Sequence, residues 1–327
     1  MMEFHTELSV KKNPDGLSLQ DKIITIGSCF SDDVGKKLFQ NKFNVLINPF
    51  GTVYNPISIH QLLMMATNHT VPPEGGYIER DEVYYHYGFH SSWNDKTLPA
   101  LQFRLKEQIQ KVHLAVAGCR CVIITYGTAW VYEHLATKSI VANCHKIPQR
   151  YFEKKLLTQK RILESFEGFY AQMKKINPTL RIILTVSPVR HIKDTLELNS
   201  VSKSILRLAC HTLTQTFDGV NYFPAYEIMM DDLRDYRFYG SDMIHPSRQA
   251  VDYIWEKFCE SLLSAETNEF IGEWKKIRAA LKHKPFHPES PSHQKFLQET
   301  LDKLHRLKNQ ADVSDEIESV RMQIKGR

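Results

Sequence analysis

The sequence predicts an α/β fold in which a parallel β-sheet is covered by helices on both faces. Three observations lead to this prediction. Short apolar runs of strand length recur along the chain, helical segments alternate with them, and glycine-containing polar motifs follow several of these runs. Strands that alternate with helices form parallel sheets, and such sheets bind ligands beyond the carboxyl ends of their strands. The loops that follow the strands are therefore where functional residues are expected.

The predicted strands share a run of four or more mostly apolar residues and cover 22–27, 43–47, 119–126, 181–187 and 220–223. The predicted helices have apolar residues at helical spacing and cover 31–41, 57–66, 97–118, 158–177, 194–217 and 247–264. In the first helix we expect Val34, Leu38 and Phe39 to face inward. The helix over 158–177 stops at Asn177-Pro178, because proline cannot continue a helix.

Two segments lie outside the alternating pattern. Residues 77–93 are rich in aromatic side chains, which predict either a hairpin folded over its own aromatics or a surface that stacks on sugar rings or an acyl chain. After the proline-broken linker 282–293, leucines and β-branched residues recur at spacings of three and four. We therefore predict a domain over 1–264 and a helical extension over 265–327 that packs on the domain or on a second copy of the chain.

Composition excludes several classes of protein. The net charge is +5 and the basic residues are spread along the chain, so no nucleic-acid surface is predicted. No apolar run is long enough to span a membrane and no secretory signal is visible, which predicts a cytoplasmic protein without a membrane partner. The six cysteines form no CxxC pair, in keeping with free thiols. Walker A and GxGxxG motifs are absent, and no cofactor is expected.

A hydroxyl and a thiol stand where the first strand meets the first helix, in Gly27-Ser28-Cys29-Phe30. The start of a helix offers free N–H groups and the positive end of its dipole, which lower a thiol's pKa and stabilise an oxyanion. Either Ser28 or Cys29 is thus a candidate nucleophile. The alternative is structural, with the serine capping the helix and the cysteine filling apolar space.

A carboxylate precedes a histidine by three residues in Asp242-Met243-Ile244-His245. At this spacing Asp242 can accept a hydrogen bond from one ring nitrogen of His245 and leave the other nitrogen to act as a base. The alternative is a capping aspartate beside a surface histidine.

Further candidates follow other strands. Gly51 and Gly127 are candidate oxyanion donors because glycine permits close approach of a backbone N–H, and Thr128 adds a hydroxyl; each glycine singly fits an ordinary turn. Asn143 and His145, together with His191, are expected to line a substrate pocket. Cys29, Cys144, His145 and His191 could also be drawn as a metal site, but their spacing matches no zinc pattern.

These motifs resemble the GSCFA-domain family. The resemblance covers about residues 20–260, and five motifs carry it in order: Gly27-Ser28-Cys29-Phe30-Ser31, residues 48–56 (Asn-Pro-Phe-Gly-Thr-Val-Tyr-Asn-Pro), Gly127-Thr128-Ala129-Trp130, Asn143-Cys144-His145-Lys146 and Ser187-Pro188-Val189-Arg190. Ser31 stands where the family name has alanine. The family is in turn similar to the SGNH (GDSL-like) hydrolases, which implies a three-layer, flavodoxin-like α/β/α fold and a serine esterase mechanism. In that comparison Gly51 and Gly127 match oxyanion-block glycines, and Asp242 and His245 match the acid and the base.

Two departures from the SGNH pattern affect the predicted chemistry. Ungapped alignment puts Ser28 at the aspartate of Gly-Asp-Ser and Cys29 at the nucleophile, so both remain candidates. Ala129 stands where the oxyanion asparagine belongs, with Thr128 or Asn143 as substitutes.

We therefore predict an ester hydrolase or acyltransferase, most simply one acting on a small acyl ester, such as acetyl, of a carbohydrate. The alternatives are a non-catalytic ligand-binding module on a degenerate scaffold and, more weakly, a metal-binding protein.

Overall fold

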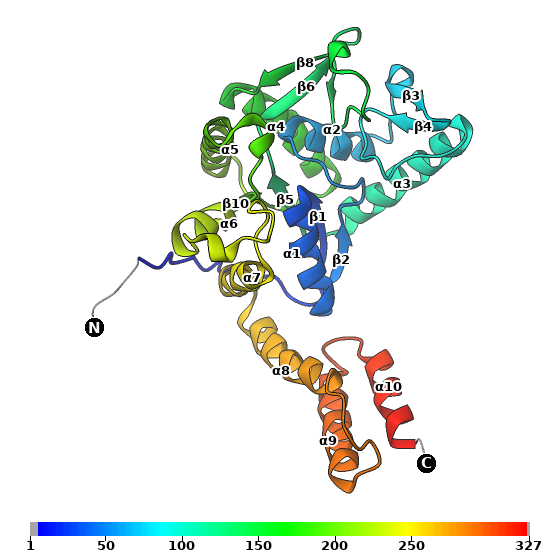
Figure 1. Ribbon diagram of the computed structural model, residues 1–327, viewed down its shortest axis with the longest axis vertical. Coiled ribbons are helices and arrows are strands. Elements are labelled where there is room, and N and C mark those ends of the chain that lie inside the picture. Colours follow the sequence, from blue (N-terminus) through cyan, green and yellow to red (C-terminus); the bar gives the residue numbers. More distant parts are fainter. Residues whose placement is uncertain (1–5, 326–327) are drawn as a thin grey trace.

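A computed structural model describes residues 6–325 and has a five-stranded parallel sheet at its centre. The strands lie in the order β2, β1, β5, β9, β10 (Figure 1). Their bounds are β1 Lys22–Gly27, β2 Asn44–Ile47, β5 Cys121–Tyr126, β9 Arg181–Val186 and β10 Val220–Tyr222. Counted along the chain within this sheet, the order is 2-1-3-4-5, the flavodoxin-like arrangement. The predicted fold class is confirmed.

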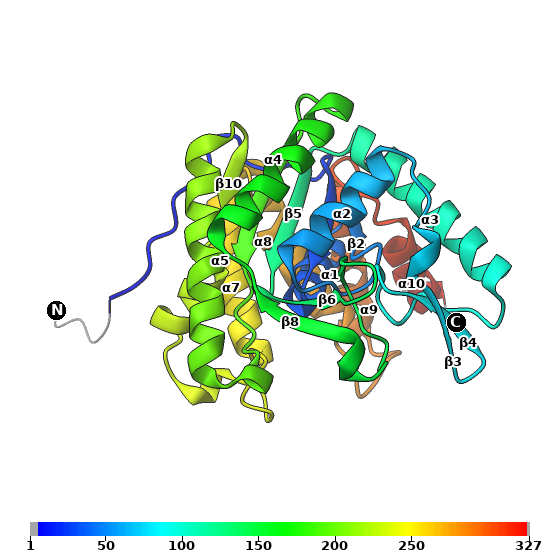
Figure 2. The ribbon, with the colours of Figure 1, turned by 90° about the horizontal axis from the view of Figure 1, so that it is seen from above.

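Helices cover both faces of this sheet and make three layers (Figure 2). Their bounds are α1 Cys29–Gln40, α2 Pro56–Thr67, α3 Leu98–Gly118, α4 Gln159–Ile176, α5 Leu196–Thr216, α6 Ala225–Glu227, α7 Arg248–Leu262, α8 Ala265–Leu281, α9 Pro291–Leu307 and α10 Ser314–Lys325. Short 3-10 turns lie at Glu74–Gly76, Gln149–Tyr151, Ile192–Asp194 and Tyr236–Phe238, and a π-helical turn at Ile228–Asp232.

Alternating strand residues divide the interior into two cores. Ile24 and Ile26 of β1 belong to the core beneath α2, α3, α4 and α5, whereas Ile23 belongs to the core beneath α1 and α7. The period of two in a strand produces this division, and burial on both faces explains the continuous apolar runs. Val34 and Leu38 of α1 are buried as expected, but Phe39 is 67% exposed. One residue turns a helix by about 100°, which carries Phe39 off the buried stripe that Leu38 occupies.

Two small antiparallel sheets lie beyond the carboxyl ends of the central strands. Strands β3 (Tyr77–Arg80) and β4 (Val83–His86) form a hairpin within the aromatic segment, and Tyr87 and Phe89 just after it are buried. A three-stranded sheet in the order β7, β6, β8 spans Ile140–Val141, Trp130–His134 and Phe152–Leu156. The second of these sheets was not predicted from the sequence.

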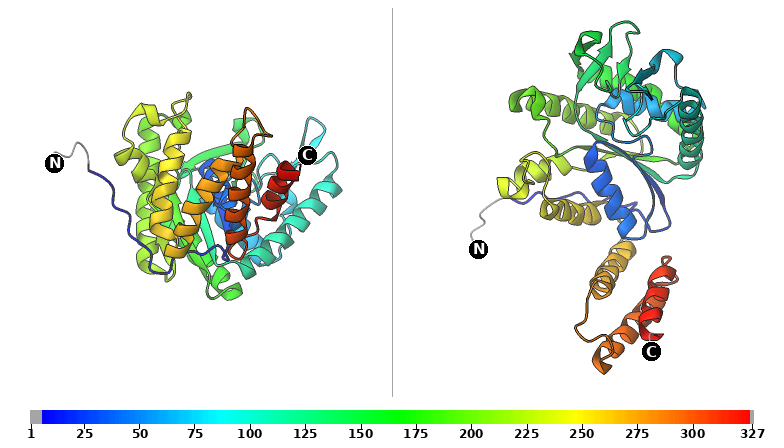
Figure 3. Two further views of the ribbon diagram at one scale, coloured as in Figure 1. Left: turned by 90° about the horizontal axis from the view of Figure 1, so that it is seen from below. Right: turned by 45° about the vertical axis from the view of Figure 1, so that its right-hand side comes forward.

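Helices α8, α9 and α10 extend away from the central sheet as a separate arm (Figure 3). The apolar stripe of the tail is buried at Leu297, Leu304, Val313 and Val320. Helix α9 begins at Pro291, so the linker ends at residue 290, three residues earlier than predicted. The tail therefore packs on helices of the same chain, while association with a second copy and the division at residue 264 stay predictions.

In the part of the chain that the structure describes, none of the helices combines the length and apolar character needed to cross a membrane.

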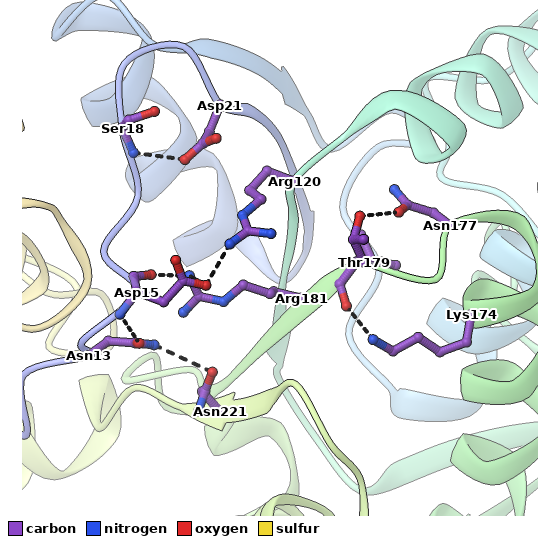
Figure 4. Close-up of polar contacts among 11 residues, drawn as sticks. Asn13, Asp15, Ser18, Asp21, Arg120, Lys174, Asn177, Thr179, Arg181 and Asn221 are labelled. Atoms are coloured by element: carbon purple, nitrogen blue, oxygen red, sulfur yellow. Dashed lines mark hydrogen bonds and ion pairs between the residues drawn. The ribbon is translucent and has the colours of Figure 1, made fainter.

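The amino ends of the strands are closed by the N-terminal segment rather than left open. Asp15 forms ion pairs with Arg120, at 2.5 Å, and with Arg181, at 3.3 Å (Figure 4). Asn13 and Asn221 join the same network at 3.4 Å. This edge of the sheet is thus occupied by structural contacts, and the opposite edge carries the candidate site.

The turn after β1 requires glycine. Gly27 has φ +140°, and a Cβ there would lie 2.2 Å from the carbonyl oxygen of Thr125 in β5. We expect Gly27→Ala to lower the free energy of unfolding by about 3 kcal/mol or more, measured by urea denaturation. The matched control is Gly168→Ala in α4, where no atom lies within 4 Å, and it should raise stability by about 0.5–1 kcal/mol. Equal stability of Gly27→Ala and the wild type would contradict the prediction.

Candidate active site

Loops from three strands and the loop before α7 converge at the carboxyl edge of the sheet. The turn after β1 lies next to the loop after β5, because Ser28 donates its backbone N–H to the Thr125 carbonyl at 3.1 Å. The loop after β9 reaches the Asp242–His245 loop through a backbone hydrogen bond from Arg190 to Ile244 at 3.2 Å. Between β1 and β5 the strand order reverses, and this switch point is where such sheets bind ligands.

The first helix is fixed at its start by an asparagine from the next loop. Asn48 accepts a hydrogen bond from the N–H of Gly27 at 2.8 Å and donates one to Asp32 at 2.7 Å. The end of β1 and the first turn of α1 are thereby held by one side chain.

Ser28 is fully buried, and its hydroxyl oxygen has no hydrogen-bond partner within residues 6–325. It occupies the cap position of α1 without making the side-chain capping bond. The buried hydroxyls of Thr25, Ser31, Thr125 and Thr185 share this unpartnered state, so it does not single out Ser28 as a reactive group.

Cys29 is the first residue of α1 and is only partly buried. Burial raises the pKa of its thiol, and the carboxylate of Asp33 raises this pKa further. The backbone N–H of Phe30 acts in the opposite direction. The thiol thus lies at a helix start, where amides lack intrahelical partners, but burial and nearby acids favour its protonated form.

Asp242 and His245 form a hydrogen-bonded pair. His245 Nδ1 lies 2.7 Å from one carboxylate oxygen of Asp242, and the other oxygen accepts the N–H groups of Ile244 and His245 at 2.9 and 3.0 Å. The backbone N–H of His245 leads the contacts that lower the pKa of Asp242 to about 2. Because Nδ1 faces the carboxylate, Nε2 is the nitrogen left to act as a base. Both side chains are about half exposed.

The pair also lies within electrostatic reach of α1. Burial raises the pKa of Asp33, and the His245 imidazole lowers it. Since Asp33 also acts on the Cys29 thiol, Asp33 lies close enough to influence both candidate catalytic groups.

A buried lysine on α5 contacts both the loop after β5 and the loop after β9. The Lys203 ammonium, on α5, donates to the carbonyl oxygens of Gly127 at 2.8 Å and Ser187 at 2.7 Å. Lys203 is 1% exposed, and burial lowers its pKa to about 7. Two neighbours on the same helix add contacts: Ser202 accepts the N–H of Ala129, and Asn199 accepts that of His191.

His191, a residue that the sequence analysis singled out, follows β9 and is in its neutral form. The pKa of this histidine is lowered to about 3, mainly by burial and in addition by the charges of Lys203 and His245. Its Nε2 is buried without a hydrogen-bond partner among the described residues. This atom lies close to Gly127: a Cβ added at Gly127 would be 3.3 Å from it. The ring of Tyr54 stands edge-on to the His191 ring, with centroids 5.5 Å apart.

A cavity of about 650 Å³ opens beside Gly127, between the loop after β5 and the three-stranded sheet. Thr128, Asn143 and His191 line it, so the structure brings these three predicted residues together. The Thr128 hydroxyl accepts the N–H of Trp130 at 3.0 Å, and the Asn143 amide donates to Ser91 at 3.0 Å. Both polar groups are therefore already engaged by the protein.

The two predicted oxyanion glycines have backbone N–H groups with partners. Gly51 donates to Asn48 at 2.8 Å and Gly127 donates to Tyr54 at 2.7 Å. Gly51 has φ +77° and packs against His90, where a Cβ would lie 2.4 Å from the His90 Cβ. The first N–H groups of α1, at Cys29 and Phe30, are the ones that a helix start leaves without intrahelical partners.

His145 lies apart from these groups. It is buried, its Nε2 lies 3.0 Å from the carbonyl oxygen of His86, and burial lowers its pKa. The weaker metal hypothesis placed it with Cys29, Cys144 and His191. Within residues 6–325, no three histidine, cysteine, aspartate or glutamate side chains form a group suited to holding a metal ion. The structure thus does not bring the hypothetical ligands together.

Comparison with known families agrees with the motifs. The model of the GSCFA family matches residues 22–258, which is more than half of the chain. The chain belongs to the GSCFA family. A second model, the C-terminal domain of GSCFA domain proteins, matches residues 274–326, which include the C-terminal part of α8 together with α9 and α10.

The solved structures to which this chain is similar share little sequence identity with it. A protein from Streptococcus pneumonia has a TM-score of 0.39 and 11% identity, over 73% of this chain and 82% of its own. A carbohydrate esterase family 3 from Talaromyces cellulolyticus has a TM-score of 0.35 and 8% identity, over 79% and 99%. A family 3 carbohydrate esterase from Clostridium thermocellum has a TM-score of 0.32 and 11% identity, over 77% and 98%. No curated protein matches the sequence.

Several site residues of this GSCFA protein were missed from the sequence. Lys203, Asn199 and Ser202 lie on one face of α5, where their spacing of three and four was a usable signal of a polar stripe facing inward. Asn48 lies inside a motif that was recognised, but its role depends on contacts with Gly27 and Asp32 that no spacing predicts.

The buried Lys203 makes stability depend on pH. Its pKa is about 7 in the folded protein and 10.5 is its ordinary value, so between these values the unfolded chain binds more protons. The free energy of unfolding should therefore rise with pH across this window, by up to about 1.4 kcal/mol per unit. Urea denaturation of the wild type should show this slope, and Lys203→Met should show a smaller one. Lys160→Met, an exposed position on α4, serves as the control. The same slope in Lys203→Met and the wild type would contradict the assignment.

Proposed function

We propose that this GSCFA protein hydrolyses an ester, with Cys29 as nucleophile and the Asp242–His245 pair as its base. The observation that carries the proposal is the hydrogen bond at 2.7 Å between His245 Nδ1 and Asp242, at the edge of the sheet where Cys29 begins α1. A base fixed by an acid, beside a nucleophile at a helix start, is the arrangement that acyl transfer requires.

Accessibility favours Cys29 over Ser28. Ser28 is completely buried, whereas Cys29 is partly exposed. Burial and the neighbouring acid Asp33 raise the pKa of the thiol, so at neutral pH it needs a base to remove its proton. His245 can supply that base through Nε2, while Asp242 stays ionised because its pKa is about 2.

The reaction then follows in balanced steps. The thiol proton passes to His245 Nε2 as sulfur bonds to the ester carbonyl carbon, and the carbonyl oxygen takes the electron pair. The N–H groups of Cys29 and Phe30 stabilise that oxyanion. The C–O bond to the alcohol breaks, the alcohol takes the proton from His245, and a thioester remains. Water, deprotonated by His245, hydrolyses the thioester to a carboxylic acid and restores the thiol.

The substrate of the proposed reaction is a small acyl ester of a carbohydrate. The cavity beside Gly127 supports this part, because aromatic side chains of Trp130 and Tyr132 line it together with amide and ammonium groups. Aromatic faces with polar groups around them suit a sugar ring. The same geometry would serve a ligand-binding module without catalysis, which the following experiment distinguishes.

Mass spectrometry of the intact protein during incubation with 4-nitrophenyl acetate tests the nucleophile and the base. We expect a single acetyl adduct, absent in Cys29→Ala and retained in Ser28→Ala. His245→Ala should lower the acylation rate about a hundredfold or more, because general-base catalysis is lost. Thermal unfolding of each variant controls for folding. An adduct that persists in Cys29→Ala and disappears in Ser28→Ala would assign the serine instead, and no adduct on the folded wild type would favour a binding module.

The pH dependence of acylation gives an independent test. Because the pKa of Asp242 is about 2, Asp242 stays ionised well above that pH, so a loss of acylation at a higher pH reports a group other than Asp242. Asp242→Asn should lower the rate at every pH, since it removes the group that fixes the imidazole. A rate in Asp242→Asn equal to that of the wild type would show that the pair is structural.

A further inference from the structure

The cavity beside Gly127 has an excess of positive charge. Three lysines line it, Lys146, Lys154 and Lys193, against one aspartate, Asp194. The fourth basic side chain on its wall, His191, is neutral at physiological pH because burial lowers its pKa to about 3. The cavity therefore presents two more positive charges than negative ones to whatever enters it.

The structure already uses one of these lysines. Lys154 forms an ion pair with Asp194, and its ammonium lies 4.8 Å from the centre of the Trp130 ring. Lys146 and Lys193 make no ion pair within residues 6–325 and are exposed at the cavity. Lys146 also has φ +60°, a strained conformation for a residue other than glycine. The two lysines without an acidic partner are the ones free to meet an anion.

A buried donor on the same wall also lacks a partner. The indole Nε1 of Trp130 is buried and has no hydrogen-bond acceptor among the described residues. An indole nitrogen can only donate, and burying it unpaired costs free energy. An acceptor on a bound molecule would satisfy it. The cavity is thus lined by an aromatic residue whose indole donor is buried without a partner and by two ammonium groups that have no acidic partner.

We propose that the cavity binds the carboxylate of an acidic sugar whose hydroxyl carries the ester. Lys146 and Lys193 bind the carboxylate, and the sugar ring lies near Trp130 with an oxygen accepting from Nε1. The inference rests on the proposed function, since it names the substrate class of that same site. Tyr54 connects the two parts: it lines the cavity, its carbonyl accepts the N–H of Gly127 at 2.7 Å, and the preceding residue, Val53, donates its N–H to Gly27 at the end of β1 at 2.9 Å.

The test compares two substrates that differ only in charge: O-acetylated glucuronic acid and O-acetylated glucuronamide. In the wild type we expect kcat/KM to be about tenfold higher for the acid, because two partly exposed charge contacts each contribute a few-fold. In the double variant Lys146→Gln, Lys193→Gln the kcat/KM values of the two substrates should differ by less than about twofold. We expect this change to come from a higher KM for the acid. Lys106→Gln on α3, an exposed lysine outside the cavity, should keep the tenfold preference.

Equal kcat/KM for the two substrates in the wild type, or a preference that survives in the double variant, would overturn the inference. Hydrolysis of 4-nitrophenyl acetate by the wild type is measured alongside, so that a failed inference is separated from a failed hydrolase. If the wild type does not hydrolyse 4-nitrophenyl acetate either, binding of free glucuronic acid and of glucuronamide is measured by tryptophan fluorescence titration, and this measurement tests the inference. Binding of the acid alone, lost in the double variant, supports the inference, and equal or absent binding of both rejects it.

Discussion

The candidate site depends on one buried ammonium group. Lys203 donates to the carbonyl oxygens of Gly127 and Ser187, which directly follow two adjacent strands of the central sheet, β5 and β9. Carbonyl groups beyond the last ladder hydrogen bond have no strand partner, and burying them unpaired would be costly. A single lysine satisfies both, so the two loops that flank the cavity are held at a fixed separation. Helix α5 therefore positions the site without contributing a side chain to its surface.

The same ammonium lies within electrostatic reach of Cys29. Burial is the main cause that raises the pKa of the Cys29 thiol, and two acids of α1, Asp33 and Asp32, raise it further. Burial lowers the pKa of Lys203 to about 7, and Cys29 acts to raise that pKa. Near neutral pH the Cys29 thiol is thus protonated. A pre-formed thiolate is not what this arrangement provides, and this is why the His245 base is central to the proposed chemistry.

The sequence was sufficient where structure is local. The strands and helices of the sheet followed from periodicity, because burial on both faces makes each strand a continuous apolar run. The Asp242–His245 pair followed from spacing, since one carboxylate oxygen accepts two backbone N–H groups within three residues and the other reaches the imidazole. Such a turn forms from its own residues and needs no distant partner. The assignment of Phe39 to the core failed because a single 100° step decides exposure at the edge of a helical stripe.

Long-range contacts account for what the sequence did not predict. Lys203 and Gly127 are 76 positions apart in the sequence, and no motif near either residue predicts their hydrogen bond. The sheet of β6, β7 and β8 is made of short strands rich in charged side chains, without the apolar runs of the central strands. This sheet forms one wall of the cavity, where the Lys154 ammonium of β8 lies over the Trp130 ring of the neighbouring strand β6. Substitutions in this small sheet would change the charge of the cavity and leave the central sheet, the turn after β1 and the Asp242–His245 pair unaltered. In the proposed function, specificity and catalysis therefore lie in separate parts of this chain, which is why the motifs predicted an ester of a carbohydrate and not the charge of the sugar.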